Sequence, residues 1–298
     1  MVVEHLFSSK RIENHPWLVA IMAFLFVAIA VSITRLVYFQ GAPKQDSLYG
    51  IFIIALAIMP AIPFFLHEII TEEKRQEFRC QRGSLFSLGG ILGFFTCYQR
   101  LIRFYGYFFI GTALGFAFCS SILPLDISNA MFAVQNQEFR FFTLSSSQVT
   151  AQGNGLEFGD IFLHNLQVLF LMLVFSFIYS IGSIFLLVWN ASLVGIFLHS
   201  YIRETTPHYI QYGALGFPAS FLFGSFNGLM RLLPHGIFEI SAFFIASISG
   251  GILSVAVERR MYKKSNLKEI ALDVIFFLLI SVGLLAIGAW IESSYLPT

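Results

Sequence analysis

Ionisable and helix-breaking residues cluster within one of the most apolar parts of the chain. The stretch RLLPHGIFEIS contains Arg231, Pro234, His235 and Glu239, whereas the flanking stretches FGSFNGLM and AFFIASISGGILSVAV contain no charged residue. On a helix that begins near Pro234, His235 and Glu239 are four residues apart and therefore share one face. A carboxylate in apolar surroundings is costly unless it is paired or protonated. These residues are therefore the first candidates for a functional site.

Polar side chains in other apolar segments could reach the same depth, and Arg231 and His235 are the partners of Glu239 nearest in sequence. One interpretation is that these groups tie a broken helix to its neighbours. The other is a polar cavity that binds or conducts a solute, built as many transporters build their sites. The candidate residues are Arg231, Pro234, His235, Gly236, Glu239, His164, Asn165, Asn190 and Asn227, with His199 as a further polar neighbour.

The same pattern argues against a catalytic site. Zinc proteases need two histidines at i and i+4 with a glutamate beside the first, and this helix offers one histidine and one glutamate. Ser241 and Ser247 lie among small residues, which is typical of helix packing in membranes. Cys119 has no evident base near it. We therefore expect no catalytic residue, no metal and no cofactor.

The composition indicates a membrane protein. Hydrophobic residues make up 57% of the 298 residues and charged residues 12%, with 36 phenylalanines, whereas soluble domains carry about 25% charged residues. A soluble globule could not cover so much apolar surface with so few charges. The net charge of +1 predicts no general attraction to nucleic acid. The lipid bilayer is therefore the expected environment.

Hydrophobic segments long enough to cross a bilayer recur along the chain, since a crossing helix needs about 20 apolar residues. Pro60 and Pro63 predict a kink in the second segment. The continuous apolar run 161–200 is about twice the length of one span, so we divide it at 179–183. The expected crossings are residues 17–39, 48–66 and 104–125, the two halves of 161–200, and residues 236–257 and 272–291.

Basic residues predict the orientation of these spans, because cytoplasmic loops are enriched in lysine and arginine. The charged segment 67–84 and the loop 259–268 should both be cytoplasmic. The long loop 126–160, which is rich in Gln, Asn and Ser, should then lie outside. It is either a solvated connection or a small ordered cap that binds partners. The N-terminus would be cytoplasmic and the C-terminus outside.

The segment 213–233 cannot be a further crossing if the loop 259–268 is cytoplasmic. It is short and contains four glycines and a proline, and non-helical backbone at membrane depth is tolerated where it is buried in protein. We therefore predict a re-entrant or broken helix there, with a new helix beginning at Pro234. The predicted fold is an all-helical polytopic membrane protein with about seven transmembrane helices and one re-entrant or broken helix.

The stretch LPHGIFEISAFFIASISGGIL resembles the signature of the stage II sporulation protein M family, which has Pro-His-Gly, a glutamate three residues on, and then small residues. Asn165 in FLHNLQV and Asn190 in VWNASLVG also fit. The resemblance covers roughly residues 95–291 and implies a five-span membrane unit. Residues 1–94 would add a transmembrane hairpin with a charged cytoplasmic segment, and residues 95–298 would form the family domain.

The resemblance also implies a function, because the sporulation protein of this family is a membrane scaffold that holds cell-wall hydrolases. We therefore expect a non-enzymatic scaffold in the cell membrane that recruits other membrane or envelope proteins through the outer loop 126–160 and its cytoplasmic segments, with homo-oligomerisation left open. The alternative is a transporter or channel-like protein whose polar site lies around Glu239 and His235.

Overall fold

The computed structural model describes residues 15–38, 48–68, 96, 99–138, 158–178, 182–258 and 266–295. All regular structure within these residues is helical. The charged segment 67–84, apart from its first two residues, and the basic residues 259–265 lie outside the described part of the chain. The same is true of residues 139–157 of the predicted outer loop.

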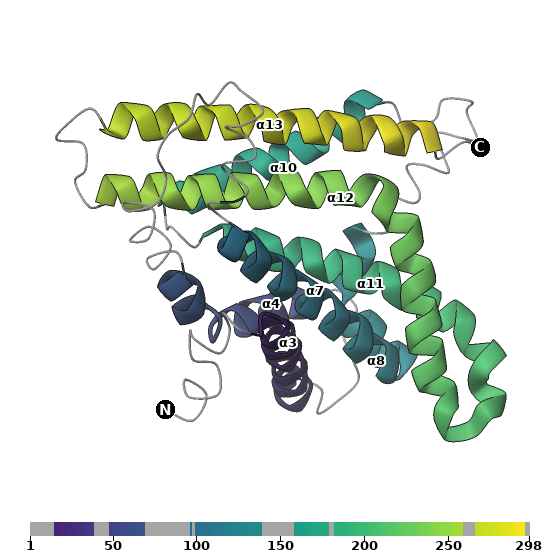
Figure 1. The fold of residues 1–298 in the computed structure, drawn as a ribbon. Coiled ribbons are helices and arrows are strands. Elements are labelled where there is room, and N and C mark those ends of the chain that lie inside the picture. Colours follow the sequence, from purple (N-terminus) through teal and green to yellow (C-terminus); the bar gives the residue numbers. More distant parts are fainter. Residues whose placement is uncertain are drawn as a thin grey trace.

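The first group of helices comes from the N-terminal part of the chain and is shown in purple and blue in Figure 1. α3 (Trp17–Tyr38) packs on α7 (Gln99–Ile122), and α4 (Tyr49–Ile58) lies beside α3. These helices bury one shared core, because residues of the N-terminal hairpin and of α7 belong to the same cluster of buried side chains. Its largest members include Met22, Ile53, Phe65, Tyr105, Phe108 and Phe116.

A small-residue pair allows α3 to lie against α7. A Cβ atom at Gly111 would collide with the backbone of Ala20, and one at Gly115 would lie 3.0 Å from the Cβ of Val27. Small residues at such positions let two membrane helices approach closely. Gly111 and Gly115 are four residues apart and lie on one face of α7, and the helix that packs on this face is α3.

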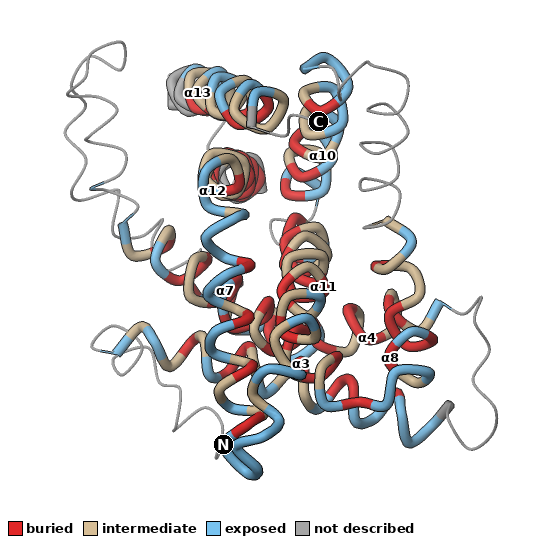
Figure 2. Tube along the Cα trace, turned by 90° about the vertical axis from the view of Figure 1, so that its right-hand side faces the viewer, coloured by how far each residue is buried: buried red, intermediate tan, exposed pale blue. Residues whose placement is uncertain are grey.

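The second group consists of α10 (Phe158–Ile178), α11 (Ser183–Tyr209), α12 (Gly216–Glu258) and α13 (Asn266–Tyr295). α10, the C-terminal part of α12 and α13 run side by side in Figure 1 and are seen nearly end-on in Figure 2. α11 joins the two groups, because it packs on α7 and also on α12. These contacts place residues from three helices around the C-terminal part of α12.

Within the described residues, five segments are long and apolar enough to cross a membrane, or up to six if one bent pair is counted. Several apolar helices of this length are typical of a membrane protein. The bent pair, Tyr49–Ile58 and Ile62–Glu68, turns through 48°, which confirms the kink predicted from Pro60 and Pro63. The predicted division at 179–183 is also confirmed by the end of α10 and the start of α11. The count of about seven is not confirmed, because one segment, Ser183–Gly251, includes both α11 and α12.

The predicted start of a helix at Pro234 is wrong. A break does occur at Gly213, which lies within the 3-10 helix η1 (Ile210–Leu215) and has a φ of 59°. From Gly216 onward, however, α12 continues through Pro234 to Glu258. Figure 1 shows α12 bending sharply along its length. We assign this bend to Pro234, because an interior proline removes one helical hydrogen bond and clashes with the preceding turn.

Two segments beyond the predicted crossings contain helix. Residues 201–209, which follow the crossing predicted to end at residue 200, form the C-terminal part of α11. The predicted outer loop 126–160 begins with α8 (Leu125–Met131) and a further helical stretch at 133–138. Met131 and Phe132 are fully buried, so the beginning of this loop is an ordered part of the core.

Candidate functional site

Glu239 on α12 lies where α10, α12 and α13 meet. The side-chain amide Nδ2 of Asn165 on α10 donates a hydrogen bond to Glu239 Oε1 at 2.6 Å. Hydrogen bonds to a charged acceptor are shorter and stronger than those between neutral groups. Asn165 and Glu239 are both half-buried. This bond therefore connects two helices whose bonded residues are 74 positions apart in the chain.

α13 closes the site at Gly288. A Cβ atom at Gly288 would lie 3.0 Å from Glu239 Cγ and 3.4 Å from the carbonyl oxygen of His235. Glycine therefore allows the backbone of α13 to lie directly against Glu239. Glu292, one helical turn further along α13, brings a second carboxyl group close enough for like-charge repulsion with Glu239.

His235 and Gly236 occupy the turn of α12 that precedes Glu239. The side chain of His235 is half-buried and Gly236 is buried. The Cβ position of Gly236 faces Leu232 of its own helix, 3.0 Å from Leu232 Cγ. His235 and Glu239 are four residues apart on a continuous helix, which confirms that they share a face, although the helix begins well before Pro234.

Arg231, a partner of Glu239 suggested by its nearness in sequence, lies elsewhere. Its guanidinium carbon is 5.5 Å from the centre of the Tyr201 ring on α11, and the residue is exposed. This geometry is that of a cation–π contact. Asn165 rather than Arg231 is therefore the observed partner of the carboxylate, and the pairing of Arg231 with Glu239 is corrected.

Three other predicted members lie away from Glu239 or bond elsewhere. Asn190 Nδ2 donates to the carbonyl oxygen of Leu186 within α11. His164 is exposed and interacts electrostatically with Glu138. Asn227 is exposed on the first part of α12. The observed site is thus smaller than the predicted one, and its predicted members are Asn165, His235, Gly236 and Glu239.

A second polar contact links α7 with α11. His199 Nδ1 lies 2.8 Å from Ser121 Oγ, and Ser121 Oγ donates to the carbonyl oxygen of Ala117 at 2.7 Å. A hydroxyl has one proton, so the histidine must be the donor in the first contact. The serine is then not activated by the histidine.

Arg203 contacts the end of α7. Its Nη2 donates to the carbonyl oxygen of Leu123 at 3.2 Å, just after the last residue of α7. A cation is favourable at this position, because the C-terminus of a helix carries partial negative charge.

Sequence reasoning missed Gly288 and Glu292 as parts of the site. The available signal was their spacing of four residues, which matches that of His235 and Glu239. α12 and α13 are joined by a short connection and run antiparallel, so two such pairs can face one another. The pairing could not be assigned, because the register of the two helices is set by their packing.

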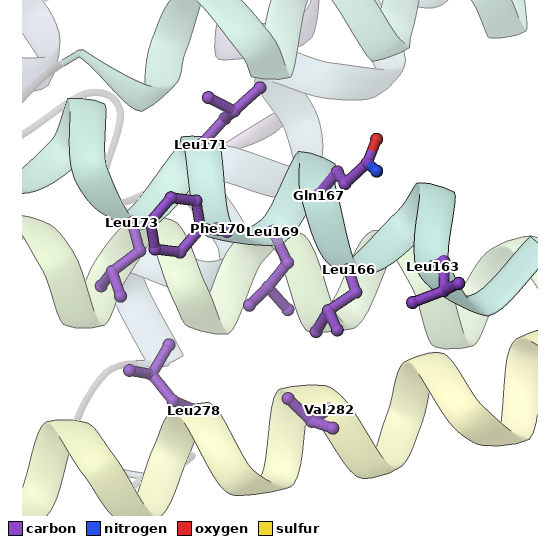
Figure 3. A pocket seen from close by; sticks show the side chains of 9 residues that line it. All are labelled: Leu163, Leu166, Gln167, Leu169, Phe170, Leu171, Leu173, Leu278 and Val282. Atoms are coloured by element: carbon purple, nitrogen blue, oxygen red, sulfur yellow. The ribbon is translucent and has the colours of Figure 1, made fainter.

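An apolar groove of about 680 Å³ lies beside this site, between α10 and α13. Figure 3 shows Leu166 and Leu169 of α10 pointing toward Val282 of α13, whereas the amide of Gln167 points away. Neither Glu239 nor His235 lines this groove. Within the described residues, no group of three or more His, Cys, Asp or Glu side chains could hold a metal ion. The described site is a hydrogen-bonded helix junction next to an apolar groove.

Comparison with known proteins adds a family match. The sequence model of the family described as stage II sporulation protein M matches residues 84–295. An uncharacterized protein of Methanocaldococcus jannaschii is 29% identical over 143 residues, which cover 47% of this chain and 71% of that protein. No solved structure matches the chain. The family match includes α7, α8 and α10 to α13, and it leaves α3 and α4 outside.

Proposed function

The chain belongs to the stage II sporulation protein M family, and from that premise we propose that it is a non-enzymatic integral membrane scaffold that organises partner proteins at the cell membrane. The polar motif around Glu239 then has a structural role. It holds α10, α12 and α13 together and so determines the shape of the surface that these helices present to partners.

The observation that carries this proposal is the way in which Glu239 is held. Asn165 donates to its carboxylate at 2.6 Å, and the backbone of α13 lies against it at Gly288. Groups that bind a solute need space for that solute. The groove beside the site is instead lined almost entirely by apolar side chains and does not include Glu239. A bracing role therefore accounts for these contacts more directly than a transport pathway does.

Replacing Asn165 with leucine tests the bracing role. The change leaves the half-buried carboxylate of Glu239 without its donor, and leaving such an acceptor unpaired costs up to about 3 kcal/mol. We expect a lower melting temperature in detergent. Asn190→Leu is the matched control, because that amide bonds to its own helix and its loss should change the melting temperature much less. Equal melting temperatures for the Asn165 variant and wild type would contradict the bracing role.

The transporter hypothesis is tested with Glu239→Gln in the same chain. Glutamine can still accept the hydrogen bond from Asn165, so the scaffold proposal predicts a folded protein with a small loss of stability. Proteoliposomes containing the wild type or the variant are compared for proton flux and for uptake of a solute panel. A flux that is present in the wild type and abolished in the folded variant would overturn the scaffold proposal.

Partner binding is proposed to involve the outer loop 126–160 and the cytoplasmic segments, with the N-terminus inside the cell and the C-terminus outside. In-cell cross-linking followed by purification is compared for wild type and for a chain in which residues 139–157 are replaced with a short Gly-Ser linker. Loss of specific cross-linked proteins is expected, and an unchanged set would exclude the loop from partner binding.

The proposed orientation is tested with the variant Lys263→Cys. A membrane-impermeant thiol reagent that is added outside the cell should not label this cysteine.

A further inference from the structure

Arg231 is an isolated charge on an otherwise apolar stretch of α12. It is the only Asp, Glu, Lys or Arg residue between Glu204 and Glu239, and it is exposed. Among the residues that the structure describes, its guanidinium has the ring of Tyr201 as a neighbour and no carboxylate partner. Its five N–H donors are therefore available to an anionic ligand.

The ring of Tyr201 on α11 holds this guanidinium in place. Arg231 Cζ lies 5.5 Å from the ring centre. The ring is itself fixed, because its centre is 5.1 Å from that of Phe197 and a Cβ atom at Gly228 would lie 3.1 Å from Tyr201 Cδ2. An arginine that lies over an aromatic face keeps the donors in its own plane free. Arg231 is thus oriented before a ligand arrives.

The position of Tyr201 along α11 places it near one boundary of the membrane. α11 begins at Ser183, and a helix rises about 1.5 Å per residue, so Tyr201 lies about 27 Å from this start. The hydrocarbon core of a bilayer is about 30 Å thick. Tyrosine is enriched at the boundary of that core, and the phosphate groups of the lipids lie there. They are therefore the anions within reach of Arg231.

Large apolar side chains surround Arg231 on the same stretch of α12. Phe226 is 57% exposed and Met230 45%, and Phe223 and Leu233 are exposed as well. Water alone would leave this apolar surface uncovered, and hydrocarbon alone would leave the guanidinium unpaired. A ligand that suits both joins a compact anion to hydrocarbon chains, as a phospholipid does.

We propose that Arg231, Tyr201 and Asn227 form a binding site for the phosphate group of a phospholipid whose headgroup has a net negative charge. The guanidinium donates two parallel hydrogen bonds to phosphate oxygens, which is the geometry that arginine favours. Asn227 is exposed four residues before Arg231, on the same face of the helix, and its amide supplies a third donor. Headgroups that carry their own cation compete with Arg231 for the phosphate, so phosphatidylglycerol is preferred over phosphatidylcholine.

Arg231→Gln tests this site in the full chain. Native mass spectrometry of the detergent-purified protein measures the affinity for added phosphatidylglycerol, which should fall at least tenfold because hydrogen bonds from a charged donor are lost. Tyr201→Leu should weaken binding about two- to fivefold, since it removes only the cation–π contact. Arg35→Gln is the matched control. Arg35 is also exposed and lies in the last turn of α3, so general charge attraction would be lost equally in both variants.

Thermal unfolding of the wild type keeps the proposal falsifiable if Arg231→Gln does not fold. A ligand that binds only the folded state raises the melting temperature. Phosphatidylglycerol should raise it more than inorganic phosphate, oleate or diacylglycerol at the same concentration. Equal protection by inorganic phosphate or oleate would indicate a site for any anion, and equal protection by diacylglycerol an apolar contact alone. Either result would overturn the proposal, as would equal affinity for phosphatidylglycerol in Arg231→Gln and Arg35→Gln.

Discussion

Replacement of Arg100 with methionine is expected to lower the free energy of unfolding by about 3–5 kcal/mol. Arg100 Nε and Nη2 donate to the two carboxylate oxygens of Glu68 at 2.9 and 3.0 Å, and the side chain of Glu68 is 3% exposed. Removal of the guanidinium would leave a buried carboxylate without this two-bond partner. Thermal or denaturant unfolding in detergent, with wild type and variant in the same micelles, measures the loss.

The double variant Glu68→Leu/Arg100→Met is the control. Replacing a buried ion pair with apolar side chains of similar size is often nearly neutral, so most of the lost stability should return. If the double variant is as unstable as Arg100→Met, the cost arises from lost packing of Arg100 and not from an unpaired charge. The pair also joins the N-terminal hairpin to the family-matched part of the chain, since the match begins at residue 84.

Gly288→Val is expected to lower the free energy of unfolding by about 2–4 kcal/mol, through overpacking and the loss of one partly buried hydrogen bond. The first added carbon would already lie 3.0 Å from Glu239 Cγ and 3.4 Å from the carbonyl oxygen of His235. The valine methyl groups must push α13 away from α12 or displace Glu239 from Asn165. The melting temperature in detergent measures the effect.

Gly283→Val provides the matched control on the same helix. It introduces the same side chain where a Cβ atom meets nothing within 4 Å, so in monomeric detergent preparations it should leave stability nearly unchanged. Comparable losses at Gly283 and Gly288 would mean that valine weakens α13 itself. A stable Gly288→Val variant would mean that α13 does not close on Glu239 as described.

Most of the helical architecture could be predicted because it depends on local properties. The first span, the kinked second segment and the division between α10 and α11 all follow from apolar length and from the positions of prolines. The helix start predicted at Pro234 is wrong for a related reason. A proline occurs at helix starts and at kinks within helices, and the residues around Pro234 do not distinguish these two cases.

The candidate site was predicted in part. His235 and Glu239 share a face because any helix brings residues four apart together, and Asn165 was included on the basis of its type and depth. Nearness in sequence favours Arg231 as the partner of Glu239. In the structure α12 is bent, and Arg231 lies over the ring of Tyr201 on α11 and not beside Glu239.

The sequence by itself determined that this is an all-helical membrane protein of a recognisable family, with polar residues on one face of an apolar helix. These properties follow from composition and from the helical period, which act over a few turns. Only the tertiary structure decided that Asn165, 74 residues away, holds Glu239 and that Gly288 lies against it. Such contacts depend on the rotation and register of packed helices, which are set by close packing between segments distant in the chain.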